Sequence, residues 1–182
     1  MRVISGTAKG IHLNTPKGMH TRPTADRVKE ALFSILHFEL PGARVLDLFA
    51  GTGQLGIEAL SRGANYAVFV DERSDACELV KGNLEKAKLS SCATVLRMDY
   101  MMYLRRCREK FDIIFLDPPY SEVFLENALK MITEIDILQS GGIIVSEYPL
   151  GKVLPAELTE HFQAKEYKYG KTALTLFRKV DA

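Results

Sequence analysis

Short apolar runs alternate with amphipathic stretches from residue 44 to the end of the chain. Runs rich in valine, isoleucine, leucine and phenylalanine predict buried strands, and stretches with an apolar residue every three or four positions predict helices. Strands are expected at residues 44–49, 66–71, 93–98, 111–117 and 141–148, and helices at 54–62, 74–88, just after Asp99, and at 121–135. This alternation predicts an α/β fold with a mostly parallel sheet and helices on both faces. Residues 160–170 and 171–179 predict a hairpin that adds antiparallel strands to one edge.

The first 40 residues have a different pattern. The short runs RVIS and IHLN, separated by GTAKG, predict a β-hairpin. A helix that Thr24 or Asp26 can cap is expected to follow and to reach about Phe38. We therefore expect an N-terminal extension over residues 1–40 and one larger domain over residues 41–182, which is long enough for a sizeable core.

Composition excludes several classes of protein. The chain is 47% hydrophobic and 26% charged, which is typical of globular proteins in water. Its apolar runs are too short to cross a bilayer, and its start lacks the apolar core of a signal peptide. The cysteines Cys77, Cys92 and Cys107 are far apart and form no C-x-x-C pair. We expect reduced cysteines in a cytoplasmic protein with no metal site and no membrane partner.

Charge is unevenly distributed although the net charge is only +1. Residues 1–25 contain no aspartate or glutamate, and their basic side chains are Arg2, Lys9, His12, Lys17, His20 and Arg22. Such a segment can be a solvated edge. It is equally suited to an enzyme that binds a polyanion, such as a nucleic acid, along one side.

Each of four consecutive expected strands has an aspartate at or near its carboxyl end. These residues are Asp47, Asp71, Asp99 and Asp117. One such aspartate is explained by a turn or a helix cap. In a parallel sheet, however, the ligand site lies at the carboxyl ends of the strands, where all four would meet. The spacing therefore predicts a ligand site there.

The stretch DLFAGTGQLG follows the first strand and contains a G-x-G-x-x-G pattern, which also occurs in dinucleotide sites. The preceding Asp47 distinguishes two cofactors by charge. NAD would place a pyrophosphate at the helix N-terminus, whereas S-adenosylmethionine carries a sulfonium and an ammonium group. The Asp47 carboxylate would repel the pyrophosphate and attract the sulfonium and ammonium groups, so the pattern favours S-adenosylmethionine. Asp71 can accept hydrogen bonds from the ribose of either cofactor, and an NAD-dependent dehydrogenase is an alternative.

The stretch FDIIFLDPPY carries the predicted chemistry. Two prolines remove two N–H donors and stiffen the backbone, which leaves only carbonyl acceptors. The Asp117 carboxylate and the Pro118 carbonyl can then accept both hydrogens of an exocyclic amine and direct its lone pair at a methyl group. Tyr120 offers a ring on which an extruded base can stack. The motif thus predicts methylation of a nucleobase amine.

The whole chain resembles the RsmD family of bacterial 16S ribosomal RNA (guanine-N2) methyltransferases. The resemblance is carried by MRVISGTAKG, TRPTADRVKEALFSIL, VLDLFAGTGQLGIEALSRGA, FDIIFLDPPY and KYGKTALTLFRK. It implies a Rossmann-like methyltransferase sheet of seven strands after the N-terminal hairpin and helix. It also implies transfer of a methyl group from S-adenosylmethionine to N2 of a guanine, in 16S rRNA or a small-subunit assembly intermediate. We expect the protein to be a monomer, although the sequence leaves its oligomeric state open.

The resemblance also implies roles for individual residues. The cofactor would be bound by Asp47, Phe49, Gly51, Gly53, Asp71 and Asp99. Catalysis would involve Asp117, Pro118, Pro119 and Tyr120. Arg22 and Thr24 of TRPT would lie near the cofactor or the target base of the substrate. Apart from the resemblance, the charge of the basic segment favours contacts of Lys9 and Lys17 with the RNA. A DNA adenine-N6 or cytosine-N4 methyltransferase, which shares the Asp-Pro-Pro-Tyr motif, is an alternative, although the chain lacks an obvious target-recognition domain.

Overall fold

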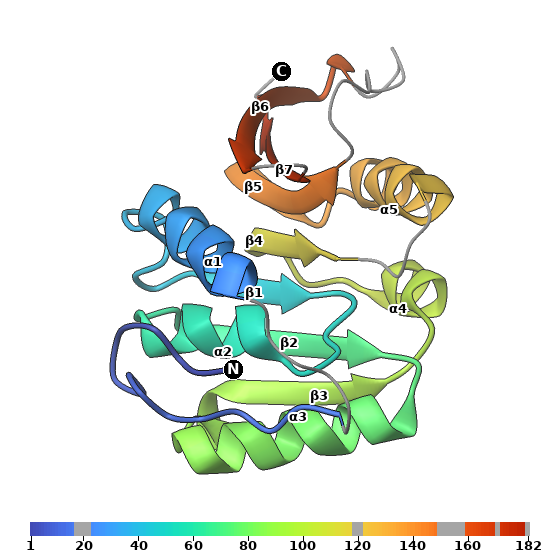
Figure 1. Cartoon of the computed structure of the whole chain (residues 1–182). Coiled ribbons are helices and arrows are strands. Elements are labelled where there is room, and N and C mark those ends of the chain that lie inside the picture. Colours follow the sequence, from blue (N-terminus) through green and yellow to red (C-terminus); the bar gives the residue numbers. More distant parts are fainter. Residues whose placement is uncertain (17–22, 118–121, 149–158, 170–171, 181–182) are drawn as a thin grey trace.

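The computed structural model describes residues 1–16, 23–117, 122–148, 159–169 and 172–180 (Figure 1). Its strands are β1 (Arg44–Asp47), β2 (Tyr66–Asp71), β3 (Ala93–Arg97), β4 (Phe111–Leu116), β5 (Leu138–Tyr148), β6 (Phe162–Tyr169) and β7 (Thr172–Lys179). Its helices are α1 (Pro23–Ile35), α2 (Gln54–Ser61), α3 (Ser74–Ala87), the 3-10 turn η1 (Ser90–Cys92), α4 (Tyr100–Arg106) and α5 (Glu122–Ile135). Within these ranges no helix is long and apolar enough to cross a membrane.

The strands form one sheet in the order β3-β2-β1-β4-β5-β7-β6. Strands β1 to β5 pair in parallel, and β7 pairs antiparallel with both β5 and β6. This confirms the predicted α/β fold with seven strands and an antiparallel edge. It also places the carboxyl ends of β1 to β4 at one edge of the sheet, which we call the carboxyl edge (Figure 1).

Alternate residues of each central strand enter two separate apolar layers. Val45 and Ile113 face α1, α2 and α3, whereas Leu46 and Ile114 face α4 and α5 (Figure 1). All four side chains are buried, as expected for parallel strands covered on both faces. Burial on both faces fixes the register of these strands, because a shift by one residue would exchange the two layers.

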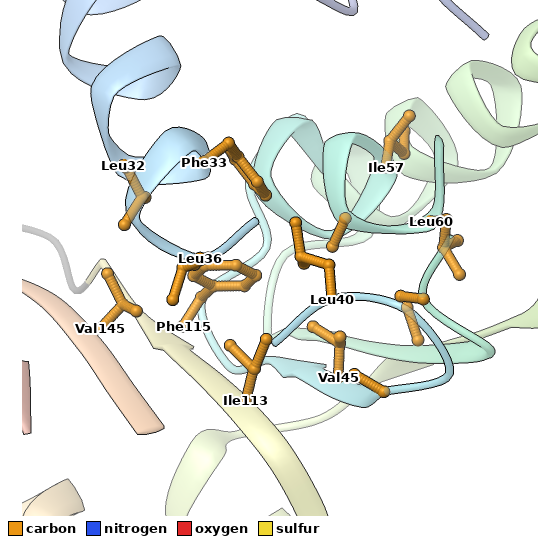
Figure 2. Close-up of a cluster of buried hydrophobic side chains, with 14 of the residues drawn as sticks. Leu32, Phe33, Leu36, Leu40, Val45, Ile57, Leu60, Ile113, Phe115 and Val145 are labelled. Carbon is orange, nitrogen blue, oxygen red and sulfur yellow. The ribbon is translucent and has the colours of Figure 1, made fainter. Parts of the chain in front are cut away.

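The first layer is built around aromatic and leucine side chains of α1. Phe33 of α1 and Leu36, which directly follows the helix, lie against Phe115 of β4 (Figure 2). The rings of Phe33 and Phe115 are 5.8 Å apart and tilted by 50°. All three side chains are completely buried. Helix α1 is therefore part of the same hydrophobic core as the sheet.

Helix α1 spans Pro23–Ile35, whereas the sequence pattern predicted a helix that begins after a cap at Thr24 or Asp26 and ends near Phe38. The earlier start agrees with the preference of proline for the first helical position, where its missing N–H is not needed. At the other end, the chain turns more tightly, since the N–H of His37 bonds to the carbonyl of Ser34 and that of Glu39 to Leu36. The predicted end was therefore wrong by one turn.

Residues 1–16, which we call the N-terminal arm, cross α2 and run beside α3 (Figure 1). The predicted β-hairpin is present in a reduced form. Arg2 and His12 form one antiparallel bridge, and the N–H groups of Val3 and Leu13 bond to the carbonyls of Ile11 and Met1, both at 3.0 Å. Other backbone N–H groups of the arm bond to side chains of the body. Ile4 and Ser5 donate to the Glu58 carboxylate at 2.8 and 3.0 Å, and Ala8 donates to the Ser61 hydroxyl at 2.9 Å.

Glu58 is the main anchor of the arm. It is completely buried in α2 and also accepts a hydrogen bond from Arg62 Nε at 2.8 Å, and Lys29 Nζ lies 3.7 Å away. Lys29 in turn donates to the Arg2 carbonyl at 2.8 Å. A buried carboxylate is tolerated only when it is paired and hydrogen-bonded, and here the arm supplies two of the donors.

Candidate active site

Four aspartates lie in a row along the carboxyl edge. Asp47 and Asp71 are the last residues of β1 and β2, Asp117 follows β4, and Asp99 precedes α4 shortly after β3. The strand order β3-β2-β1-β4 therefore places Asp47 between Asp71 and Asp117. Both neighbours act electrostatically on Asp47 and raise its pKa. The fold thus brings together the four side chains that the sequence pattern singled out.

Residues 50–53 form a tight turn between β1 and α2, which we call the glycine turn. The N–H of Gly53 bonds to the Ala50 carbonyl at 2.7 Å, and Gly51 and Gly53 have φ angles of 56° and 76°. Glycine adopts this left-handed conformation without strain. A Cβ atom on Gly51 would meet no atom within 4 Å. The turn therefore presents an open backbone surface that a ligand can approach closely.

The third glycine of the pattern has a different role. A Cβ atom on Gly56 would lie 2.3 Å from the ring of Phe69 in β2. Gly56 therefore allows α2 to pack closely on the sheet and does not face the open surface. Its backbone N–H donates to the Asp47 carboxylate at 3.1 Å. This contact joins the end of β1 to the first turn of α2.

Asp47 is a buried acid. It is 2% exposed, and burial is the main cause that raises its pKa from 3.8 to about 8. The hydrogen bond from Gly56 lowers the pKa of Asp47, whereas the negative charges of Asp117 and Asp71 raise it further. Without a cation beside it, the carboxyl is close to neutral at physiological pH. A positively charged ligand would favour its ionised form.

Asp71 connects the end of β2 to the glycine turn. One carboxylate oxygen accepts from the Gly51 N–H at 2.9 Å, and the other accepts from the Arg73 N–H at 2.9 Å. Asp71 is half-buried, so its oxygens keep a side toward solvent. The residue predicted to bind ribose therefore also fixes the turn.

Asp99 is exposed and caps α4, because its carboxylate accepts from the Met102 N–H at 3.1 Å. This is the capping role that any single strand-end aspartate can have. The cap uses one oxygen, Oδ1, and the other oxygen has no bond to the backbone of α4.

Three aromatic rings from three connections lie along the same edge. The ring of Phe49 is 5.1 Å from that of Tyr100, and Tyr100 is 5.7 Å from Phe124. Phe49 follows β1, Tyr100 begins α4, and Phe124 lies in α5 with 39% of its surface exposed. The rings thus extend an apolar surface from the glycine turn to α5. Sequence reasoning missed Tyr100 and Phe124, although their positions just after strand ends were a usable signal.

The remaining predicted residues have different positions. Asp117 is exposed at the end of β4. Lys9 is exposed on the N-terminal arm. Thr24 lies in the first turn of α1. The predicted residues outside the described part of the chain are Lys17, Arg22, Pro118, Pro119 and Tyr120.

The chemistry of this edge fits S-adenosylmethionine. Cations are favoured by the acidic row, and above all by the buried Asp47, while the space beside Gly51 is open to a ligand. The half-buried Asp71 offers acceptors for hydroxyl groups. In contrast, a hollow of about 270 Å³ lined by Phe38, Gly42 and Asp112 lies at the opposite edge of the sheet. Among the described residues, no group of three or more histidine, cysteine or acidic side chains is arranged to hold a metal ion.

The chain is similar to known proteins over its full length. It is 41% identical over 182 residues to the protein YlbH of Bacillus subtilis, covering 98% of this chain and 99% of that one. It is 32% identical over 180 residues to ribosomal RNA small subunit methyltransferase D of Escherichia coli, covering 98% and 90%.

Solved structures agree with these sequence similarities. The Escherichia coli protein YhhF superposes with a TM-score of 0.87 at 28% identity, covering 100% of this chain and 99% of that chain. A Haemophilus influenzae protein superposes with a TM-score of 0.82 at 31% identity, covering 99% and 98%. The family model described as conserved hypothetical protein 95 matches residues 1–178. The resemblance drawn from the sequence motifs is thereby confirmed, and the chain belongs to the RsmD family.

Proposed function

We propose that this protein transfers a methyl group from S-adenosylmethionine to the N2 amine of a guanine in 16S ribosomal RNA. The observation that carries the proposal is the row of Asp47, Asp71, Asp99 and Asp117 around an open glycine turn. Membership of the RsmD family supports it, since relatives at 32% and 35% identity are named ribosomal RNA small subunit methyltransferases.

The cofactor would be held along β1, β2 and β3. Its sulfonium supplies a methyl group that an amine nitrogen can attack. Asp47 provides the negative charge that stabilises the cationic methionine end, and the glycine turn allows close approach of the backbone. Asp71 accepts hydrogen bonds from ribose hydroxyls. Asp99 accepts one from the adenine amine through the oxygen that does not cap α4.

The target amine would be held by Asp117 and the Pro118 carbonyl. Accepting both N–H bonds keeps the nitrogen lone pair free and directs it away from those acceptors. The Asp117 carboxylate also stabilises the positive charge that develops on the nitrogen as the methyl group is transferred. Tyr120 stacks on the extruded guanine.

The extension over residues 1–40 would bind the RNA. Lys9 is exposed on the N-terminal arm, on which Arg2 is also exposed. Lys17, Arg22 and Thr24 continue the same basic stretch in sequence. Phosphate contacts by these residues would position the substrate without reading its bases. The proposal places the protein with 16S rRNA or an assembling small subunit in the cytoplasm.

The decisive experiment is methyl transfer to rRNA purified from cells that lack this gene, followed by mass-spectrometric mapping of the modified nucleoside. We expect N2-methylguanosine at one site of 16S rRNA with wild-type protein and none with Asp117→Ala. N6-methyladenine or N4-methylcytosine formed in DNA would support the alternative DNA methyltransferase and contradict the proposal. If calorimetry showed binding of NAD and no binding of S-adenosylhomocysteine, the protein would not be a methyltransferase of any kind.

A further inference from the structure

Asn83 is a completely buried side chain of α3 that bonds to two segments far apart in the sequence. Its amide oxygen accepts from the Asn14 N–H at 2.7 Å, and its amide nitrogen donates to the Asn14 carbonyl at 3.1 Å. The same nitrogen donates to the Thr52 carbonyl at 2.9 Å. One side-chain amide therefore connects the N-terminal arm to the glycine turn.

The position of Asn83 in α3 is unusual for a polar residue. It occupies a place in the apolar face of the helix, between Val80 and Leu84, both of which are buried. A buried amide stabilises a fold only where its donors and acceptors are satisfied. Both atoms of Asn83 are satisfied by backbone groups, and an apolar residue at this position could make none of these bonds.

The glycine turn needs contacts of this kind. Gly51 and Gly53 are both in the left-handed region and glycine has few steric limits, so contacts from outside support the one bond inside the turn, from the Gly53 N–H to the Ala50 carbonyl. Asp71 fixes the Gly51 N–H from the sheet side, and Asn83 fixes the Thr52 carbonyl from α3. The peptide between Thr52 and Gly53 can rotate only if the bond to Asn83 breaks.

The second partner of Asn83 is the end of the N-terminal arm. Asn14 is also bonded through its side chain to Lys86 Nζ at 2.5 Å. Earlier in the arm, Ile4 and Ser5 bond to Glu58, and these contacts do not involve the glycine turn. Asn83 thus fixes the last part of the arm and the cofactor turn with the same side chain.

We propose that Asn83 is a positioning residue that couples cofactor binding at the glycine turn to RNA binding by the N-terminal arm. A cofactor that orders the turn also holds Asn83 in the orientation that fixes Asn14. In the same way, RNA that orders the arm holds Asn83 in the orientation that fixes the turn. By linkage, each ligand raises the affinity of the other by the same factor. This inference rests on the proposed function, because it assumes that the arm contacts rRNA.

The experiment compares Asn83→Ala with Ser61→Ala. Ser61 is buried and holds the same arm through two bonds, to Ala8 N and the Ser5 carbonyl, but it has no bond to the glycine turn. Calorimetry would measure the affinity for S-adenosylhomocysteine with and without rRNA from cells lacking the gene. Thermal unfolding of both variants would show that they lose comparable stability. Should Asn83→Ala fail to fold, Asn83→Ser, which cannot reach Thr52 as the amide does, replaces it.

We expect rRNA to tighten S-adenosylhomocysteine binding to wild type and Ser61→Ala by about fivefold or more. In Asn83→Ala this factor should fall to one, and the affinity without RNA should drop about tenfold. An unchanged affinity and coupling factor in Asn83→Ala, or equal losses in both variants, would overturn the inference. If wild type neither binds nor methylates rRNA or small-subunit particles from those cells, the proposed function fails. The comparison without RNA then still decides whether Asn83 positions the turn.

Discussion

The Asp47 carboxylate accepts a hydrogen bond from the Gly56 N–H at 3.1 Å while it is shielded from solvent on its other sides. One backbone donor does not compensate for the loss of water, so burial raises the pKa of Asp47 from 3.8 to about 8. Between these values the folded protein keeps a proton that the unfolded chain releases. The free energy of unfolding contributed by this group therefore decreases as the pH rises toward about 8 and is constant above it.

The first prediction concerns the pH dependence of cofactor binding. Because a cationic ligand favours ionised Asp47, binding below the raised pKa must release a proton. The affinity for S-adenosylmethionine should therefore increase as the pH rises and level off above about 8. Calorimetry at several pH values measures this slope. In Asp47→Asn the pH dependence of the affinity should disappear, and the affinity should be low at every pH. If this variant kept the pH dependence, the released proton would come from another group.

The second prediction separates the roles of two glycines in one motif. Gly56→Ala places a Cβ atom 2.3 Å from Phe69, so it should lower the free energy of unfolding by about 1–3 kcal/mol. Gly51→Ala meets no neighbouring atom, and its main cost is the left-handed backbone, roughly 1–2 kcal/mol.

Chemical denaturation and S-adenosylhomocysteine binding distinguish these two variants. We expect Gly51→Ala to lose cofactor affinity more than tenfold, because its methyl group occupies the open surface of the turn. Gly56→Ala should bind with nearly wild-type affinity where it is folded. If Gly56→Ala lost cofactor affinity and Gly51→Ala kept it, the cofactor would not approach Gly51.

The third prediction concerns catalysis at Asp117. Asp117→Ala should abolish methyl transfer and leave the S-adenosylhomocysteine affinity nearly intact, because this exposed side chain is assigned to the target amine. Asp117→Asn should keep partial activity if the residue accepts a hydrogen bond without removing a proton. Single-turnover transfer to rRNA measures both variants. Wild-type turnover by Asp117→Ala would exclude the assignment.

The fourth prediction concerns the anchor of the N-terminal arm. Glu58→Ala leaves the N–H groups of Ile4 and Ser5 without their acceptor and Lys29 without its buried partner. Removal of one partner from a buried ion pair costs about 3–5 kcal/mol, so urea unfolding should show a loss of that size. The control is Glu78→Ala, which removes an exposed pair with Lys81 and should leave the stability close to that of wild type, because solvent and salt screen such a pair. Equal effects of the two substitutions would contradict the anchoring role.

The fifth prediction separates RNA binding from cofactor binding. Lys9→Glu combined with Lys17→Glu should weaken rRNA binding and reduce the log–log salt slope by about 0.7–0.9 for each lost phosphate contact. The matched control is Lys165→Glu with Lys168→Glu, which makes the same charge change on exposed positions of β6, at the far edge of the sheet. Affinity for S-adenosylhomocysteine should not change in either variant. An unaltered slope in the first variant would place the RNA-binding surface elsewhere.

The local pattern of the sequence determined most of the fold. The alternation of apolar runs and amphipathic stretches predicted β2 without error and the other strands to within a few residues. It also predicted the parallel direction of the strands, which brings Asp47, Asp71 and Asp117 to one edge, although it did not predict the strand order. These features follow from residues close together in the chain, because burial on both faces of a parallel strand requires a continuous apolar run. The positions of the strand-end aspartates then follow from the direction of the strands.

Only the tertiary structure decided how the N-terminal arm and the motif glycines are used. The sequence predicted the antiparallel pairing within the arm. It did not predict that the N–H groups of Ile4 and Ala8 bond to the buried side chains of Glu58 and Ser61, because those bonds depend on the packing of α2. Gly56 and Gly51 belong to one motif, yet one contacts Phe69 and the other faces open space. Which backbone group meets which buried side chain is a property of packing between distant segments, and no local pattern encodes it.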